Sequence, residues 1–401
     1  MSEILKEFYP PARILMGAGP SNVHPRVLQA MGAPILGHLD PDFLGVMDDV
    51  REVLRRVFQT KDGFTIPISG TGTAGMEAAL CNVIEHGDTV LVCVNGYFGE
   101  RMVDIAERCG AKVERLDFPW GHPVDPSQVE AAFKRLPHVK ALAIVHAETS
   151  TGARSPAKEL AELAHRHNAL LLLDCVTSLG GEDVAMDRWG IDVAFSATQK
   201  CIGAPPGLSP ISFSPRALDV VSHRKSKVQS LYLDITTLQT YWANRRMYHH
   251  TAPISMIYAL REALRMLQEE GLEARWHRHQ HNADALRAGL QALGLKLFAH
   301  EHSRLNPLTS VSIPEGVPDL EVRRTLLREF NMEIGGGLGP IAGKVWRIGL
   351  MGEASKEANV LLLLSAFERL LPRFGFEVGA GTGVAAASRS LAGAQVKVAK
   401  S

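Results

Sequence analysis

The stretch FTIPISGTGTAGMEAALCNVIEHGD, residues 64–88, decides the fold class. Its apolar start indicates a strand, its glycines indicate a turn, and the alanine-rich segment after them indicates a helix. The next stretch, DTVLVCVNGYFGERMVDIAERCG at residues 88–110, repeats this order. Short apolar strands that alternate with helices are typical of a parallel sheet with helices on both faces.

Further units of the same kind follow along the chain. We expect strands in HVKALAIV (138–145), ALLLLD (169–174) and DVAFS (192–196), with a helix in PAKELAELAHRHN (156–168). Right-handed crossovers bring the loops that follow such strands to one edge of the sheet. The sequence therefore predicts an α/β fold whose polar loops gather along that edge.

The pattern changes near residue 270. A long helix is predicted in residues 253–271, and the strand candidates 308–314 and 344–352 then alternate with helices. The last residues are poor in large apolar side chains, which is typical of a flexible segment. We expect an N-terminal arm (1–16), a large domain (17–269), a smaller α+β domain (270–375) and a flexible tail (376–401).

Composition excludes several classes of function. Lys+Arg and Asp+Glu both number 43, so no overall charge favours nucleic acid or an anionic membrane surface. The five cysteines show neither CxxC pairs nor metal-ligand spacing, so we expect no metal site and reduced thiols. No apolar run approaches the roughly 20 residues that span a bilayer. The start MSEILKEFYPPARIL is unlike a signal peptide, and we expect a soluble, cytoplasmic protein.

Two charged residues stand at the ends of predicted strands. Asp174 ends the run LLLLD, and Lys200 follows the strand DVAFS. Adjacent strand ends would place them across one cleft. Pyridoxal phosphate uses such a pair, because a lysine binds it as a Schiff base and an acid keeps its ring nitrogen protonated. A plain Asp–Lys ion pair fits the same spacing, so the pattern alone leaves both interpretations open.

Three other loops offer weaker signals. In SGTGTAG, glycines before a helix suit a phosphate, although many such turns are only tight connections. In VNGYFGER, Tyr97 or Phe98 suits either stacking on a flat ring or ordinary packing. In HAETSTG, Thr149 brings a hydroxyl to a strand end. Arg347, inside VWRIGL, suits a substrate carboxylate or an internal core partner.

Together these segments resemble the class V, fold-type I aminotransferases, in particular the alanine–glyoxylate and serine–pyruvate (serine–glyoxylate) branch. The resemblance runs from residue 17 to residue 374. Its most specific stretches are STGARSP, LLLDCVTSLGG, MDRWGID, TQKCIGAPPGLSPISFS, RMYHHTAP and GGGLGPIAGKVWRIGLMG. The resemblance implies a large, mainly parallel seven-stranded sheet domain that binds pyridoxal 5′-phosphate, followed by a smaller C-terminal α+β domain.

The resemblance also implies roles for individual residues. Lys200 would bind the cofactor and then move a proton between the substrate Cα and the cofactor. Asp174 would pair with the ring nitrogen. Phe98 and Val176 would pack on the ring, and Thr149 would approach its oxygen. The phosphate would be held by Thr71, Gly72, Thr73 and Gln199.

The same resemblance implies a homodimer and a reaction. Tyr248 and Thr251 would complete the phosphate site of the neighbouring subunit, and Arg347 would bind the α-carboxylate of amino and keto acid alike. By a ping-pong mechanism, the amino group of L-alanine or L-serine would pass to glyoxylate or pyruvate.

We weighed three alternatives to an alanine–glyoxylate or serine–pyruvate aminotransferase. Other donors, such as 2-aminoethylphosphonate with pyruvate or ureidoglycine with glyoxylate, use the same framework. A lyase or desulfurase needs a mobile cysteine late in the chain, and no cysteine follows Cys201. An inactive homologue is expected to lose Lys200, Asp174 or Arg347, and all three are present.

Overall fold

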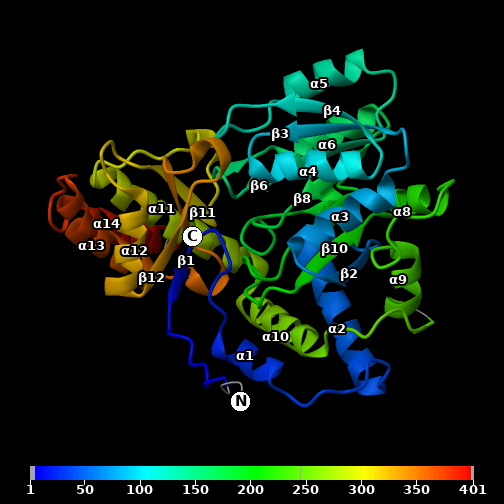
Figure 1. Ribbon diagram of the computed structural model, residues 1–401, viewed down its shortest axis with the longest axis horizontal. Coiled ribbons are helices and arrows are strands. Elements are labelled where there is room, and N and C mark those ends of the chain that lie inside the picture. Colours follow the sequence, from blue (N-terminus) through cyan, green and yellow to red (C-terminus); the bar gives the residue numbers. More distant parts are fainter. Residues whose placement is uncertain (1–4, 244, 399–401) are drawn as a thin grey trace.

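A seven-stranded sheet forms the centre of the larger part of the chain (Figure 1), in a computed structural model that describes residues 5–243 and 245–398. Its strand order is β2-β10-β9-β8-β5-β3-β4. The strands are β2 (Phe64–Ser69), β3 (Thr89–Val94), β4 (Lys112–Asp117), β5 (Ala141–Val145), β8 (Leu170–Asp174), β9 (Val193–Phe195) and β10 (Leu208–Phe213). Only β10 runs antiparallel to its neighbours, so the predicted, mainly parallel sheet is confirmed.

Helices cover this sheet because each buries an apolar face against the apolar side chains of the strands. On α4 (Tyr97–Arg108), for example, Met102 and Ile105 are buried, whereas Arg108 is exposed. Helices α3 and α4 pack against the central strands, and α2 packs against β2. The helices of this part are α1 (Pro25–Met31), α2 (Pro41–Phe58), α3 (Gly72–Val83), α4, α5 (Pro126–Arg135), α6 (Ala157–Arg166), α7 (Met186–Trp189), α8 (Pro215–Ser222), α9 (Ile235–Trp242) and α10 (Ile254–Glu270).

A four-stranded sheet forms the centre of the smaller part, in the order β1-β12-β13-β11. Its strands are β1 (Ile14–Met16), β11 (Leu308–Ser312), β12 (Met332–Gly336) and β13 (Val345–Gly349). Helices α11 (Leu272–Ala292), α12 (Asp319–Phe330) and α13 (Glu357–Leu370) accompany it, and Trp346 stacks on Phe367 within its own hydrophobic core. Strand β1 comes from the N-terminal arm and pairs in parallel with β12, which the sequence did not suggest. The domain limits themselves stay predictions.

The C-terminal segment differs from the flexible tail that the sequence predicts. Residues Thr382–Val398 form helix α14, which packs along α11. Ala387 and Leu391 on this helix belong to the hydrophobic core of the smaller part. Small residues let the two helices approach closely, since a Cβ on Gly289 would lie 3.0 Å from the backbone oxygen of Gly383. The scarcity of large apolar residues therefore reflects close helix packing.

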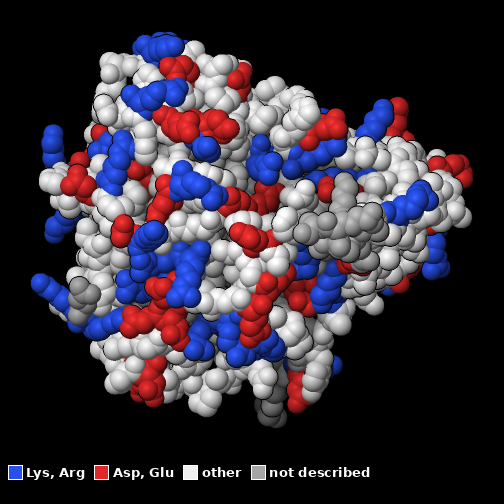
Figure 2. Space-filling view, turned by 180° about the vertical axis from the view of Figure 1, so that it is seen from behind, with Lys and Arg blue, Asp and Glu red and all other residues white. Residues whose placement is uncertain are grey.

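The surface carries charges of both signs. In the view of Figure 2, Lys and Arg side chains are interspersed with Asp and Glu side chains over the whole visible face. This distribution agrees with the balanced composition. Within residues 5–243 and 245–398, no helix combines the length and the apolar character that crossing a membrane requires. Two short strands, β6 (Ala147–Glu148) and β7 (Ala153–Arg154), pair beside the pocket described next.

Candidate active site

A pocket of about 140 Å³ opens where the central strands end and helices α3 and α4 begin. It brings together nine of the residues that the sequence analysis selected, from five separate loops. These are Thr71, Gly72, Thr73, Phe98, Thr149, Asp174, Val176, Gln199 and Lys200. The remaining lining residues are Met76, Arg101, Val145, Ala147 and Ala197. The edge of the sheet predicted from the strand pattern is therefore where these side chains meet.

Asp174 lies at the end of β8 with only 3% of its surface exposed. Its Oδ1 accepts a hydrogen bond from the backbone N–H of Val176 at 2.8 Å. Burial raises the pKa of this carboxyl to about 7, and the charges of Lys200 and Arg101 offset the shift only in part. A cation placed against the carboxylate would reverse this effect, so the site suits a protonated ring nitrogen.

Lys200 faces the same pocket and is 9% exposed. Its Nζ donates a hydrogen bond to the backbone oxygen of Ala18. Burial, assisted by the positive charge of Arg347, lowers the pKa of this amine to about 8. A substantial neutral fraction near that pH makes the amine a nucleophile and a base. Glycine is favoured at position 19 because its φ is +103°, and a Cβ there would force the lysine side chain to move.

The turn before α3 leaves polar groups open. Thr71 occupies the N-cap position, but its side chain makes no capping hydrogen bond within the described residues. A Cβ on Gly72 would lie 2.9 Å from Cβ of Ala197, so only glycine lets the backbone line the pocket there. Gln199 Oε1 is buried and has no hydrogen-bond partner in the described part of the chain. The helix N-terminus favours a phosphate group, and the side-chain amide of Gln199 could donate to the same group from its Nε2.

The walls of the pocket combine apolar and hydroxyl groups. Phe98 lies in the first turn of α4, and Val176 lines the pocket after β8. The Thr149 hydroxyl lies 2.6 Å from that of Thr177, so one of the two donates to the other. An aromatic ring, a branched side chain and a hydroxyl around one small pocket fit a flat heterocycle with a polar substituent. The residues present thus fit pyridoxal phosphate from ring to phosphate.

Arg347 reaches the pocket region from the smaller part of the chain. It lies on β13, is 9% exposed, and donates from Nε to the backbone oxygen of Gly336 at 2.7 Å. Its Nη1 donates to the backbone oxygen of Thr149 at 3.2 Å. Burial lowers the pKa of this guanidinium. Within the described residues no carboxylate pairs with it, so its charge is available to an anionic ligand.

The structure does not bring Tyr248 and Thr251 to the pocket of their own chain. Tyr248 is 62% exposed, and its ring lies 5.2 Å from that of His38. Thr251 is exposed as well. A role in the site of a neighbouring subunit therefore stays a prediction for both residues.

Two buried or half-buried residues of the site were not selected from the sequence. Arg101 donates from Nη1 to the hydroxyl of Thr73 at 3.0 Å. Glu148 is fully buried and accepts hydrogen bonds from the backbone N–H groups of Phe98 (3.1 Å) and Ser150 (3.0 Å). Arg101 lies one helical turn after Phe98, and this spacing places both residues on one side of a helix. The same spacing in the sequence could have identified Arg101 as a neighbour of Phe98.

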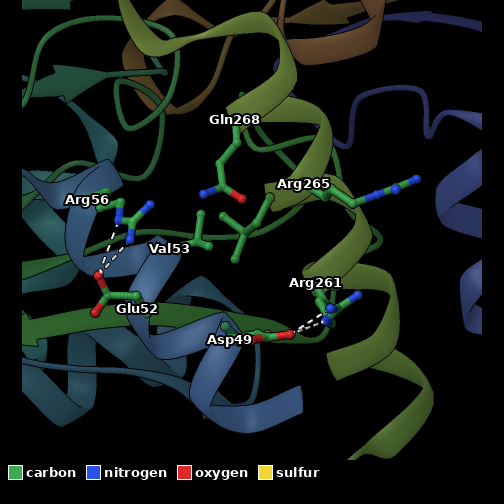
Figure 3. A pocket seen from close by; sticks show the side chains of 9 residues that line it. Asp49, Glu52, Val53, Arg56, Arg261, Arg265 and Gln268 are labelled. Atoms are coloured by element: carbon green, nitrogen blue, oxygen red, sulfur yellow. Dashed lines mark hydrogen bonds and ion pairs between the residues drawn. The ribbon is translucent and has the colours of Figure 1, made fainter. Parts of the chain in front are cut away.

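A larger hollow of about 280 Å³ lies elsewhere, between α2 and α10 (Figure 3). Its arginines are already paired: Arg56 contacts Glu52 at 3.0 Å, and Arg261 contacts Asp49 at 2.6 Å. None of the selected site residues lines it. Paired, exposed charges contribute little binding energy, so size alone does not make this hollow the functional site.

Comparisons with known proteins point to one family. The family model described as aminotransferase class-V matches residues 14–341. The (S)-ureidoglycine–glyoxylate transaminase of Bacillus subtilis is 41% identical over 95% of this chain and 96% of its own. The alanine–glyoxylate aminotransferase of Callithrix jacchus is 43% identical over 92% of this chain and 90% of its own.

Solved structures agree with this result. The ureidoglycine–glyoxylate aminotransferase from Bacillus subtilis superposes with a TM-score of 0.94 at 42% identity, covering 96% of this chain and 99% of that one. The alanine–glyoxylate aminotransferase from Nostoc sp. has a TM-score of 0.90 at 49% identity, covering 92% of this chain and 97% of that one.

Proposed function

The chain belongs to the class V aminotransferase family, and we propose that it transfers the amino group of L-alanine or L-serine to glyoxylate or pyruvate. Enzymes of this family and fold depend on pyridoxal phosphate, and this chain is such an aminotransferase. The observation that carries the proposal is that Lys200 and Asp174 line one pocket, while Arg347 donates to the backbone oxygen of Thr149, which lines the same pocket. A nucleophilic amine, a buried acid and a carboxylate-binding guanidinium are the three groups that transamination requires.

In this proposal the pocket residues divide the work of holding the cofactor. Lys200 would bind it covalently, and Asp174 would pair with its ring nitrogen. Phe98 and Val176 would pack on the ring, and the Thr149 hydroxyl would interact with the ring oxygen. Backbone N–H groups of the turn at Thr71, Gly72 and Thr73 would hold the phosphate together with Gln199. When bound, pyridoxal phosphate supplies a protonated ring that accepts electrons from the substrate Cα.

Lys200 moves the proton. Its amine would remove the proton from the substrate Cα and deliver it to the C4′ carbon of the cofactor within the same half-reaction, and it would move a proton in the opposite direction in the second half-reaction. Burial favours this role, because it lowers the pKa of the amine to about 8 and keeps water from competing for the proton. Asp174 stabilises positive charge opposite its carboxylate throughout, since the buried site offers few other partners.

Arg347 orients both substrates. Its guanidinium is fixed by the carbonyl oxygens of Gly336 and Thr149, which leaves its remaining N–H groups for a carboxylate. Amino acid and keto acid share that carboxylate. One arginine therefore serves both half-reactions, as a ping-pong mechanism requires.

We also propose that two copies of the chain complete each other's sites through Tyr248 and Thr251. Support comes from the exposure of Tyr248 and of Met247, 62% and 54% respectively, since large apolar side chains left exposed together favour a protein contact. A cytoplasmic location fits the five buried free cysteines, because reduced thiols are usual in a reducing compartment.

A second candidate donor is (S)-ureidoglycine. It is favoured by the similarity to the Bacillus subtilis transaminase, which covers 95% of this chain in sequence and 96% in structure. Glycine formation from glyoxylate separates the candidates, with L-alanine, L-serine and (S)-ureidoglycine offered singly at equal concentration. Fastest turnover with L-alanine or L-serine supports the first proposal. Turnover with (S)-ureidoglycine alone replaces it with the second.

A further inference from the structure

Arg101 holds an unpaired positive charge against the pocket. Its Nη1 donates to the hydroxyl of Thr73 at 3.0 Å. Its guanidinium carbon lies 5.3 Å from the ring centre of Tyr97 and 5.2 Å from that of Phe98. Contacts with the faces of aromatic rings hold a guanidinium in place without neutralising it. Thr73, Tyr97 and Phe98 therefore hold the side chain in place, and none of them neutralises its positive charge.

The neighbouring arginines show how unusual this environment is. Arg108, two turns later on α4, pairs with Asp104 at 3.0 Å, and Arg115 on β4 pairs with Glu100 at 2.9 Å. Arg101 forms no ion pair with any carboxylate among the described residues. Its charge still acts within the pocket, because it lowers the pKa of Asp174. A half-buried cation without a counter-ion suits an anionic ligand.

A second positive feature converges on the same place. Helix α3 begins at Gly72, and the first-turn N–H groups at its N-terminus carry the positive end of the helix dipole. The Thr73 hydroxyl accepts the hydrogen bond from Arg101, so its own proton remains free to be donated. The helix N-terminus, the free hydroxyl proton and the guanidinium all favour an anion at this end of the pocket.

We propose that Arg101 is a specificity-determining residue for the phosphate group of the cofactor. Its charge, held in register by Thr73, makes the pocket prefer pyridoxal 5′-phosphate to the unphosphorylated aldehyde. The inference rests on the cofactor part of the proposed function and adds a residue to it. It requires no particular amino donor.

Equilibrium binding of two aldehydes to the apoprotein tests this role. Pyridoxal 5′-phosphate and pyridoxal are titrated separately into wild type, Arg101→Met, Arg101→Lys and the control Arg108→Met, and binding is followed by absorbance. For Arg101→Met we expect pyridoxal phosphate affinity to fall about 10- to 100-fold, the loss typical of a hydrogen-bonded charge, with pyridoxal changing by less than about threefold. Arg101→Lys retains a positive charge, so its affinity for pyridoxal phosphate should lie between those of wild type and Arg101→Met. Arg108→Met should bind both aldehydes as wild type does.

Several outcomes overturn the proposal. If Arg101→Met loses affinity for both aldehydes to the same extent, Arg101 only supports the packing of the Phe98 ring. Unchanged binding, or a wild type without preference for the phosphorylated aldehyde, means that it plays no part in phosphate selection. Wild type supplies a second measurement that does not depend on a variant folding: added salt should weaken pyridoxal phosphate binding more than pyridoxal binding, and equal weakening contradicts the proposal. If Arg101→Met loses the preference for pyridoxal phosphate over pyridoxal but the wild-type protein shows no transamination, the proposed substrates are wrong and the role of Arg101 is still supported.

Discussion

Nη1 of Arg347 donates a hydrogen bond to the backbone oxygen of Thr149 at 3.2 Å. This contact joins strand β13 of the smaller sheet to the loop that follows β5 in the larger one. The arginine therefore depends on both parts of the chain for its position. If Arg347 binds the substrate carboxylate as proposed, substrate binding would be coupled to the relative placement of the two sheets through this one side chain.

Arg347→Gln should raise the apparent KM for the amino acid and for the keto acid together. Loss of a charged, bidentate partner weakens carboxylate binding by roughly 2 to 3 kcal/mol, so each KM is expected to rise about 30- to 150-fold. Steady-state kinetics with both substrates varied measure this. A change confined to one substrate would show that the other carboxylate binds elsewhere.

Gly19→Ala should damage the site although it replaces no residue to which a chemical role is assigned. The new Cβ overlaps the Lys200 side chain, and the φ of +103° is unfavourable for alanine. We expect slower capture of pyridoxal phosphate and a free energy of unfolding lower by about 1 to 2 kcal/mol. Gly87→Ala, at φ +89° with no atom within 4 Å of the new Cβ, is the matched control for backbone strain. Equal behaviour of the two variants would refute the Lys200 contact.

Asp174 should make the stability of the apoprotein depend on pH. Its folded pKa of about 7 exceeds the ordinary value of 3.8, so the folded state binds more protons between these values. The contribution of this carboxyl to stability is therefore greatest at low pH and is lost as pH rises through about 7. Between pH 5 and pH 8, wild type should lose roughly 2 to 3 kcal/mol relative to Asp174→Asn, as measured by urea unfolding. A constant difference between the two proteins would contradict the raised pKa.

Glu148→Gln should loosen the start of α4. The buried carboxylate accepts from the N–H groups of Phe98 and Ser150, and an amide offers one acceptor oxygen where the carboxylate offers two. We expect a free energy of unfolding lower by about 1 to 3 kcal/mol. Weaker cofactor retention should follow, because Phe98 loses its support. Glu107→Gln, at an exposed position of α4, serves as the control.

The strand pattern was sufficient to predict the larger sheet and the edge where the site lies. LLLLD becomes β8 with Asp174 at its end, and Lys200 follows β9, because buried parallel strands have a clear apolar signature. The direction of β10 and the pairing of β1 with β12 were not predicted, since strand pairing depends on contacts distant in sequence. Helix α14 was missed because alanine and glycine pack closely yet resemble a flexible composition.

The site was predicted unevenly for a similar reason. Residues within strand-end motifs, such as Thr73 and Asp174, lie in the pocket as expected. Arg101 and Glu148 were missed because their importance arises from their partners, which belong to other loops. A charged residue on a helix looks like a surface residue until its neighbours are known.

The absorbance spectrum of the holoenzyme, recorded as L-alanine and then glyoxylate are added, tests the central role of Lys200 most directly. In wild type the pyridoxal band should convert to the pyridoxamine form and return. In Lys200→Ala, supplied with pyridoxal phosphate, the conversion should be slower by at least about 10²- to 10⁴-fold, the contribution typical of a positioned base. Conversion at the wild-type rate in that variant would contradict the assignment of Lys200.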